Sequence, residues 1–321
     1  MLQHTRRAIV TALAVTGTAA CAPQASPPVR TPLDMAAYER DTQQWRVTRL
    51  DAIAGPDGWS TVAGLVWLDS ATYTVGTAAS SGIALPAGHA AATVGTFTVQ
   101  DSTVHFTAAP RAAVLVDSLR VDTITVTADK GRTPMVLRTG SVTLRVIERG
   151  GRRAIRVKDS SYVLRTDFKG LDYFPLDTAL RVIARLVPHA TPRTVRILNV
   201  IGQTEEYASP GTLEFTIRGR PYRITATYEG RDTTQYFLIF RDSTSRTTTY
   251  PAGRFMYAAH VDSTGTTVVD FNRAYTPPCA FTPFATCPLP PPENTLPIAL
   301  VAGEKRYTGP HGATLAEVRR D

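Results

Sequence analysis

A cluster of polar side chains follows a predicted strand near residue 270 of this 321-residue chain. Asp270 and Asn272 are two positions apart, so on a strand their side chains point to the same face. With Arg254 they would offer a carboxylate, an amide and a guanidinium, which donate and accept hydrogen bonds in fixed directions. Such a set suits a sugar or another small polar ligand, on which an aromatic ring stacks. The predicted ligand-binding residues are Arg254, Asp270, Asn272, Arg273, Tyr275 and Glu304.

An enzyme is the alternative interpretation of the same residues. Glu304 and Asp270 are the candidate pair of carboxyl groups for general acid/base chemistry, with Asn272 and Arg254 beside them. The sequence lacks the usual catalytic patterns: the Gly-x-Ser-x-Gly elbow, the His-Glu-x-x-His helix, Ser-x-x-Lys, a phosphate-binding glycine loop and a dinucleotide fingerprint. No catalytic residue, cofactor or metal ligand is therefore assigned from the sequence.

A purely structural role is the third interpretation. Aspartate and asparagine at the end of a strand often cap their own turn. Arg254 would then pair with Asp270 to fix the loop. The prolines Pro277-Pro278 and 290–292 would stiffen this segment into a strap. An envelope protein built in this way would use the strap for protein contacts.

Two of the three cysteines lie inside this proline-rich segment. Cys279 and Cys287 have seven residues between them, and we expect them to form a disulfide in an oxidising compartment. Closing so short a loop would stabilise the chain by roughly 2–3 kcal/mol. A zinc site would need two further ligands, and only His260 lies within twenty residues of Cys279.

The beginning of the chain resembles a secretory signal peptide, predicted over residues 1–20. Arg6 and Arg7 precede an uncharged stretch that ends in Thr-Ala-Ala before Cys21. Small residues directly before a cysteine resemble the bacterial lipoprotein cleavage box, so Cys21 is the predicted lipidation site. An ordinary signal peptide with Cys21 incidental is the alternative. Residues 21–32 include four prolines and are predicted to form an extended tether. Ala22 instead of aspartate after the cysteine favours the periplasmic face of the outer membrane.

Secondary-structure signals indicate a mainly β protein behind one helix. A helix is predicted over residues 33–54, ending at Gly55-Pro56. Two β-sandwich or barrel-like units follow, over residues 55–150 and 151–308, with a tail at 309–321. The Gly150-Gly151 pair predicts a tight hairpin between two alternating apolar runs, and Gly219-Arg220 predicts a second one.

Basic residues crowd the predicted junction of the two units: Arg145, Arg149, Arg152, Arg153, Arg156 and Lys158, against Glu148 alone. Their side chains alternate between the faces of the hairpin, which favours a solvated tip over an anion site. The whole chain has a charge of +8, and losing Arg6 and Arg7 with the signal lowers it to +6. So small an excess on an exported protein excludes nucleic-acid binding.

Several motifs resemble the bacterial family named domain of unknown function 1684 (DUF1684). The most distinctive is Asp270-Phe271-Asn272-Arg273-Ala274-Tyr275-Thr276-Pro277-Pro278-Cys279, which continues to Cys287 and Asn294. Similar pieces occur in the family's order from about residue 38 to 307, among them Gly64-Leu65-Val66-Trp67-Leu68, Phe168-Lys169-Gly170-Leu171 and Ala302-Gly303-Glu304-Lys305. Thr276 stands where the family is expected to have asparagine. The resemblance carries no activity with it, because the family has none established.

The first β unit has a weaker resemblance, in its strand-and-turn rhythm, to a forkhead-associated sandwich. The phosphothreonine-reading residues of that family are missing, since Thr77 follows Gly76 where an arginine belongs. The sequence thus predicts an exported envelope lipoprotein, a binding or accessory module for a small polar or glycan ligand. Its expected partner is the membrane, through the lipid anchor.

Overall fold

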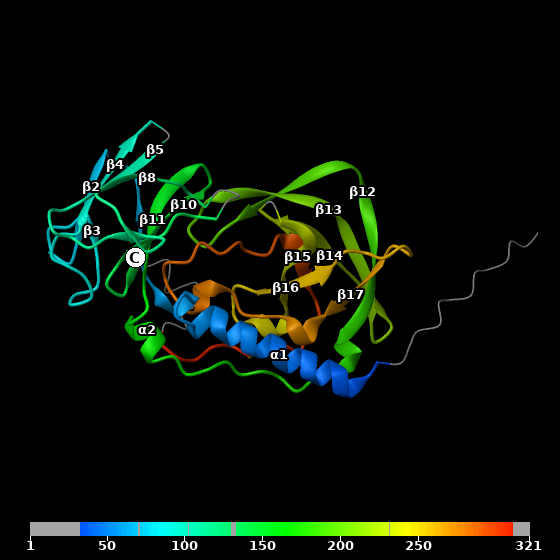
Figure 1. The fold of residues 1–321 in the computed structure, drawn as a ribbon. Coiled ribbons are helices and arrows are strands. Elements are labelled where there is room, and N and C mark those ends of the chain that lie inside the picture. Colours follow the sequence, from blue (N-terminus) through cyan, green and yellow to red (C-terminus); the bar gives the residue numbers. More distant parts are fainter. Residues whose placement is uncertain (1–32, 70, 102, 130–132, 231, 311–321) are drawn as a thin grey trace, which may run out of the picture.

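The computed structural model describes residues 33–69, 71–101, 103–129, 133–230 and 232–310. The predicted signal peptide, Cys21, the tether and almost all of the tail lie outside the described residues. The chain is mainly β, with one long N-terminal helix followed by two β units, as predicted (Figure 1). No helix within the described ranges has both the length and the apolar character needed to cross a membrane.

Helix α1 (Met35–Ala54) begins and ends close to the predicted limits. The carboxylate of Asp34 accepts the backbone N–H of Ala37 at 3.0 Å and so caps the first turn. At the other end the N–H of Gly55 donates to the carbonyl of Asp51. The buried side chains of the helix are Tyr38, Thr42, Arg49 and Ile53, spaced so that they form one stripe. Most of this stripe is polar, so the helix is held by hydrogen bonds and an ion pair more than by apolar burial.

The first unit consists of two packed sheets. One has the order β1 (Val62–Trp67), β11 (Arg152–Asp159), β10 (Val142–Arg149), β9 (Leu137–Thr139), β6 (Leu115–Val116) and β7 (Leu119–Arg120). The other has the order β3 (Ile83–Ala84), β2 (Thr72–Gly76), β4 (Gly95–Gln100), β5 (Thr103–Ala108) and β8 (Thr123–Val126). Their facing side chains form one apolar core that includes Phe97, Phe106, Leu144 and Val157.

The hairpin predicted at Gly150-Gly151 joins β10 to β11, with both glycines at positive φ, 54° and 77°. The predicted unit boundary between residues 150 and 151 therefore cuts through this turn. Because β11 pairs with β10 on one side and β1 on the other, the first unit extends to Asp159. The basic residues of the junction belong to this sheet.

The second unit is an antiparallel sheet that runs up and down in chain order and nearly closes into a barrel. Its strands are β12 (Arg181–Leu198), β13 (Thr204–Ile217), β14 (Arg220–Glu229), β15 (Asp232–Asp242), β16 (Arg254–Ala259) and β17 (Thr266–Asp270). Strand β17 pairs with β12, and the hydroxyl of Thr267 donates to the carbonyl of Ala259 in β16 at 2.7 Å. The turn of the second predicted hairpin lies one residue earlier than expected, at Arg218-Gly219.

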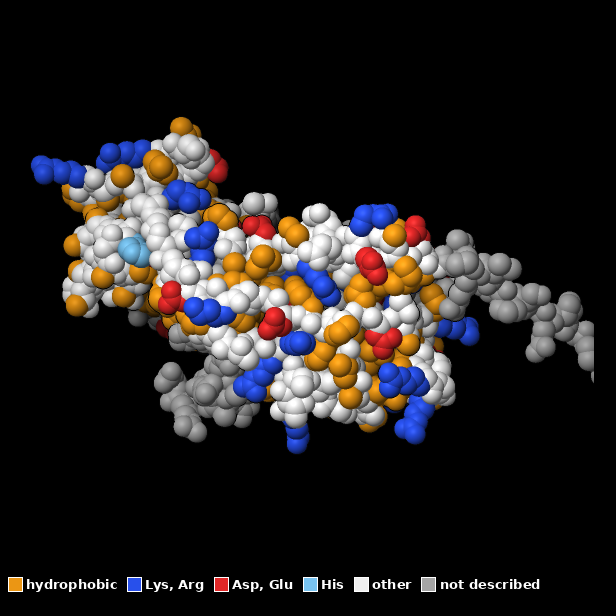
Figure 2. Space-filling view, turned by 90° about the horizontal axis from the view of Figure 1, so that it is seen from below, with side chains coloured by type: hydrophobic (Ala, Val, Ile, Leu, Met, Phe, Trp, Pro, Cys, Tyr) orange, Lys and Arg blue, Asp and Glu red, His pale blue; other side chains and the backbone are white. Residues whose placement is uncertain are grey.

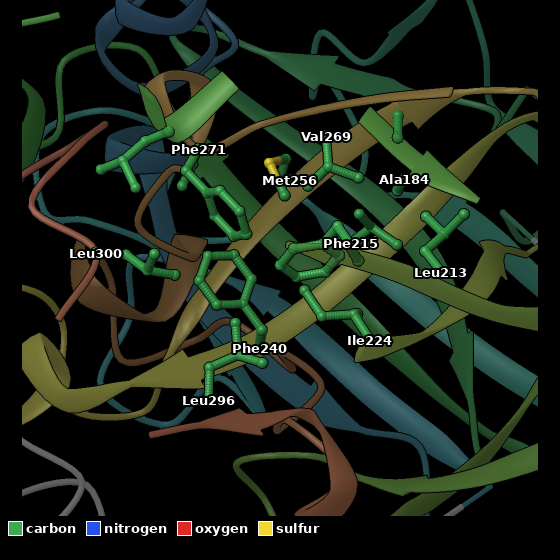
Figure 3. Close-up of a cluster of buried hydrophobic side chains, with 14 of the residues drawn as sticks. Ala184, Leu213, Phe215, Ile224, Phe240, Met256, Val269, Phe271, Leu296 and Leu300 are labelled. Atoms are coloured by element: carbon green, nitrogen blue, oxygen red, sulfur yellow. The ribbon is translucent and has the colours of Figure 1, made fainter. Parts of the chain in front are cut away.

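Aromatic and aliphatic side chains fill the barrel (Figure 3). The ring of Phe271 lies 5.7 Å from that of Phe215 and 5.5 Å from that of Phe240. Leu296 of the short strand β18 (Thr295–Leu296) and Leu300 close this core with side chains from the C-terminal segment. Strand β15 is buried on both faces, since Phe240 faces the barrel core while Phe237 faces a second apolar cluster outside the barrel.

The outer cluster joins the barrel to α1 and to the proline-rich segment. It includes Ile53 of the helix, Phe255 of β16, and Phe281, Cys279 and Cys287 of the segment. Short helical turns connect these parts: α2 (Val163–Thr166) and the 3₁₀ turns Trp59–Thr61, Thr178–Leu180, Ser243–Arg246, Phe271–Arg273, Pro278–Ala280 and Pro292–Asn294. The proline-rich segment is thus packed between the helix and the barrel wall.

Candidate ligand-binding site

Asp270, the central residue of the predicted site, lies where β17 ends beneath the first turns of α1. The hydroxyl of Tyr38 donates to both of its carboxylate oxygens, at 3.0 and 2.9 Å. Burial, and then the charge of Asp270, raise the pKa of Tyr38 well above its usual value. Tyr38 therefore stays a neutral donor, and the carboxylate is held in one orientation.

Asn272 does not share a face with Asp270, because the strand ends at Asp270 and the chain enters a 3₁₀ turn. The backbone N–H and side-chain amide of Asn272 donate to Asp270 at 3.1 and 3.0 Å. The amide also bonds the backbone of Asp177 in both directions, at 2.8 and 2.9 Å. Asn272 is 1% exposed, so it fixes the loop and is not free to bind a ligand.

Two arginines stand near Asp270 at the edge of a pocket of about 430 Å³. Their Nε atoms lie 3.9 Å (Arg273) and 4.0 Å (Arg181) from the carboxylate. Both side chains remain about a third exposed. Tyr38 and Tyr257 contribute aromatic walls, and the remaining polar lining is Asp34, Asp41 and Asp270. On the face seen in Figure 2, acidic and basic side chains are likewise intermingled.

Arg254 is not part of this pocket. It is fully buried, and its Nη2 donates to Asp242 at 2.7 Å and to the carbonyl of Leu300 at 2.9 Å, while Nη1 donates to the carbonyl of Ala302. The expected pairing of Arg254 with Asp270 is therefore wrong. Arg254 instead ties the end of β15 to the C-terminal segment that closes the barrel.

Glu304 is also absent from the pocket. Its carboxylate accepts Nε of Arg49 at 2.7 Å and the backbone N–H of Thr276 at 2.9 Å, and it is fully buried. Asp270 and Glu304 contact opposite ends of α1 through Tyr38 and Arg49, eleven residues apart, which is roughly 16 Å along a helix. The two carboxylates thus belong to separate hydrogen-bond networks on different turns of the helix.

Tyr275 is half-buried and packed, not open to a ligand. The guanidinium of Arg49 lies 4.5 Å from its ring centroid, and the ring of Tyr257 stacks on it at 6.1 Å. Phe281, the other ring considered for stacking, is 1% exposed within the outer cluster. Of these aromatic groups, Tyr257 is the one that reaches the pocket.

Cys279 and Cys287 are not bridged in the structure, where they are two buried free thiols, and the expected disulfide stays a prediction. They adjoin each other, and Sγ of Cys287 accepts the backbone N–H of Cys279 at 3.1 Å. Burial and the neighbouring Cys279 raise the pKa of the Cys287 thiol well above its usual value. No cluster of three or more metal-ligating side chains occurs within the residues that the structure describes.

Sequence reasoning missed Tyr38, Arg181 and Tyr257 as pocket residues and Arg49 as the partner of Glu304. Tyr38 and Arg49 carried one usable signal, since they lie with Thr42 and Ile53 on one stripe of the predicted helix. In the sequence of the helix alone, a polar stripe predicts a face exposed to solvent. The stripe is buried because the barrel packs against it, and the helix sequence does not indicate that contact.

Three comparisons place these findings beside known proteins. Residues 166–305 match the family model described as protein of unknown function (DUF1684). An uncharacterised protein of Haloarcula marismortui, solved in solution by NMR, is 34% identical, with a TM-score of 0.38; the match covers 44% of this chain and 78% of that one. No curated protein matches the chain.

Proposed function

We propose that this chain, which residues 166–305 place in the DUF1684 family, is a non-catalytic binding module for a small polar ligand, with a glycan as the leading class. The pocket under the first turns of α1 is the binding site. Its carboxylate, Asp270, accepts sugar hydroxyls, while Arg181 and Arg273 donate to ring or substituent oxygens. Tyr257 provides an apolar ring face.

The main support for this proposal is the way in which Asp270 is oriented while its two arginine neighbours stay loosely paired. The carboxylate is fixed by Tyr38 and by the turn of Asn272, yet its arginine neighbours stand 3.9 and 4.0 Å away, beyond a close hydrogen bond. Polar groups that are oriented but incompletely paired are what a preorganised recognition site presents to its ligand. A ligand oxygen that bridges Arg181 and Arg273 would complete their pairing.

Binding is favoured over catalysis by the separation of the carboxylates. General acid/base chemistry needs both groups within hydrogen-bond reach of one substrate, and Glu304 is committed to Arg49 at the far end of the helix. The enzyme alternative based on Asp270, Asn272, Arg254 and Glu304 is not supported by this arrangement.

The proposal includes export and anchoring by a lipid on Cys21, at the periplasmic face of the outer membrane. The pocket is lined by Leu33 and Asp34 at the start of α1. The stretch 21–32 can extend to at most about 40 Å. The anchor would therefore keep the pocket near the bilayer, where envelope glycans are attached. Membrane fractionation and fatty-acid labelling of the full chain test this part, with Cys21→Ser as the unlabelled control.

Ligand binding is tested with the full chain carrying Cys21→Ser and a panel of neutral, amino and uronic mono- and disaccharides. Saturation-transfer NMR identifies a binder, and calorimetry measures its affinity. Arg181→Gln and Tyr38→Phe are expected to weaken it at least tenfold, about 1.4 kcal/mol each. Arg152→Gln, on the exposed hairpin tip, is the matched control and leaves the affinity unchanged. Equal affinities of wild type and Arg181→Gln would refute the pocket as the site.

A further inference from the structure

Three arginines of the described chain are less than a tenth exposed: Arg49 (8%), Arg156 (7%) and Arg254 (0%). Two of them have a carboxylate partner, Glu304 for Arg49 and Asp242 for Arg254. Arg156 has none. Its Nε and Nη2 are buried without a hydrogen-bond acceptor, and the ring of Trp59 lies 4.9 Å from its guanidinium carbon. Burying a cation without a hydrogen-bond acceptor costs free energy, so we expect this side chain to bind an acceptor.

The position of Arg156 explains why it is buried. Ile155 and Val157, its neighbours on β11, point into the sandwich core, so Arg156 points to the opposite face of the sheet. Arg145 is directly across from it on β10. Cys287 is among the groups close enough to influence the pKa of Arg156, so the arginine lies toward the proline-rich segment. The predicted solvated tip is therefore a partly buried basic cluster between the two units.

Carboxylates near this cluster are already engaged. Asp57 accepts both Arg145 and Lys158, and Asp129 accepts Arg149 at 2.9 Å. Three cations thus already share these two carboxylates, and neither carboxylate is bonded to Arg156. Burial, and then the charge of Arg149, lower the pKa of Arg156 to about 10. At neutral pH the guanidinium still carries its charge.

We propose that Arg156 is the centre of a binding site for a small oxyanion, phosphate or sulfate, at the junction of the two β units. The unpartnered atoms Nε and Nη2 are adjacent on one edge of the guanidinium, and this fork matches two oxygens of a tetrahedral anion. The positive surroundings from Arg145, Arg149 and Lys158 add to the attraction. The site is separate from the ligand pocket under α1 and does not depend on it.

The test is thermal unfolding of the full chain with Cys21→Ser, in inorganic phosphate and in chloride at equal ionic strength. Phosphate at a hundred times its Kd is expected to raise the Tm by about 4 °C or more. Arg156→Gln abolishes the rise. Arg152 lies on the same strand as Arg156, but it is exposed and paired with Asp69, so Arg152→Gln retains the rise. No rise in the wild type, or an equal rise in Arg156→Gln, would overturn the proposal.

Two further measurements complete this test, one with a second variant and one with lipid vesicles. If Arg156→Gln does not fold, Arg156→Lys keeps the charge and loses the fork, and it should weaken phosphate binding at least tenfold by calorimetry. Equal binding by Arg156→Lys would overturn the bidentate site. Vesicles of phosphatidylglycerol test a lipid headgroup as the source of the phosphate. Because Arg156 is 7% exposed, we expect no Arg156-dependent effect of vesicles, and an effect of vesicles without one of free phosphate would contradict the small-anion site.

Discussion

Arg49 of helix α1 and Glu304 form a buried ion pair, 2.7 Å between Nε and Oε1, across 255 positions of the chain. The same guanidinium donates to the carbonyl of Thr276 and covers the ring of Tyr275. One arginine thus connects the helix, the proline-rich segment and the C-terminal segment. Burial works against its charge, but the Glu304 carboxylate keeps the pKa of Arg49 above its usual value.

Removing one partner of this pair leaves the other charge buried without compensation. Arg49→Met or Glu304→Gln should each lower the free energy of unfolding by about 3–5 kcal/mol. The double variant should lose less than the sum of the two. Urea unfolding of the four proteins measures the coupling. Additive losses would show that the two side chains are stabilised independently of each other.

Gly303 is required by its backbone and by its surroundings. Its φ is +77°, and a Cβ would lie 2.3 Å from the carbonyl oxygen of Ala274. Gly303→Ala should therefore destabilise the chain by more than the roughly 1–2 kcal/mol of left-handed strain alone. Gly170 has a similar φ of +87° with open space around it, so Gly170→Ala should show only the strain. Equal losses in urea unfolding would mean that the backbone at Gly303 moves aside without cost.

The two thiols of Cys279 and Cys287 are inaccessible, because both side chains are buried. Burial raises the pKa of the Cys287 thiol, whereas hydrogen bonds from Cys287 and Tyr250 outweigh burial and lower that of Cys279. With Cys21→Ser, the native chain should not react with Ellman's reagent, and the denatured chain should show both thiols. An intact mass lighter by two hydrogens, with no thiol released by denaturant, would instead establish the bridge that is absent from the structure.

Asp159 predicts a pH dependence of stability. Burial opposes its ionisation, but hydrogen bonds from His89 and the N–H of Ser161 hold its pKa below the usual value of 3.8. A lowered carboxyl pKa stabilises the fold above the unfolded value, and this contribution is lost as the pH falls through the folded one. Asp159→Asn should thus be less stable than wild type near pH 7, with the difference shrinking below about pH 4. A constant difference across this range would assign the loss to the neutral hydrogen bonds alone.

Local signals in the sequence were sufficient for the helix and for the Gly150-Gly151 hairpin. Each depends on neighbouring residues: Asp34 caps its own turn, and two adjacent glycines accept positive φ. The mainly β class also followed from short alternating apolar runs. The unit boundary failed because pairing of β11 with β1 joins segments about ninety positions apart, which no local pattern records.

The site was predicted in part for the same reason. Asp270 and Arg273 lie at the pocket, but strand parity misled the interpretation of Asn272, since β17 ends one residue after Val269. Arg254 and Glu304 are charged residues. Their partners, Asp242 and Arg49, are brought to them only by the tertiary fold. A charge in a sequence does not say whether its partner is solvent, a ligand or a buried side chain.

The C-terminal segment has a consequence for synthesis. Both buried arginines that have a carboxylate partner depend on it: Arg49 needs Glu304, and Arg254 needs the carbonyls of Leu300 and Ala302. Leu296 and Leu300 also close the barrel core. A nascent chain that still has residue 304 inside the ribosome therefore holds Arg49 without its carboxylate, Arg254 with Asp242 as its partner but without the two carbonyls, and an open barrel. The second unit can complete its native structure only after residue 304 has left the ribosome.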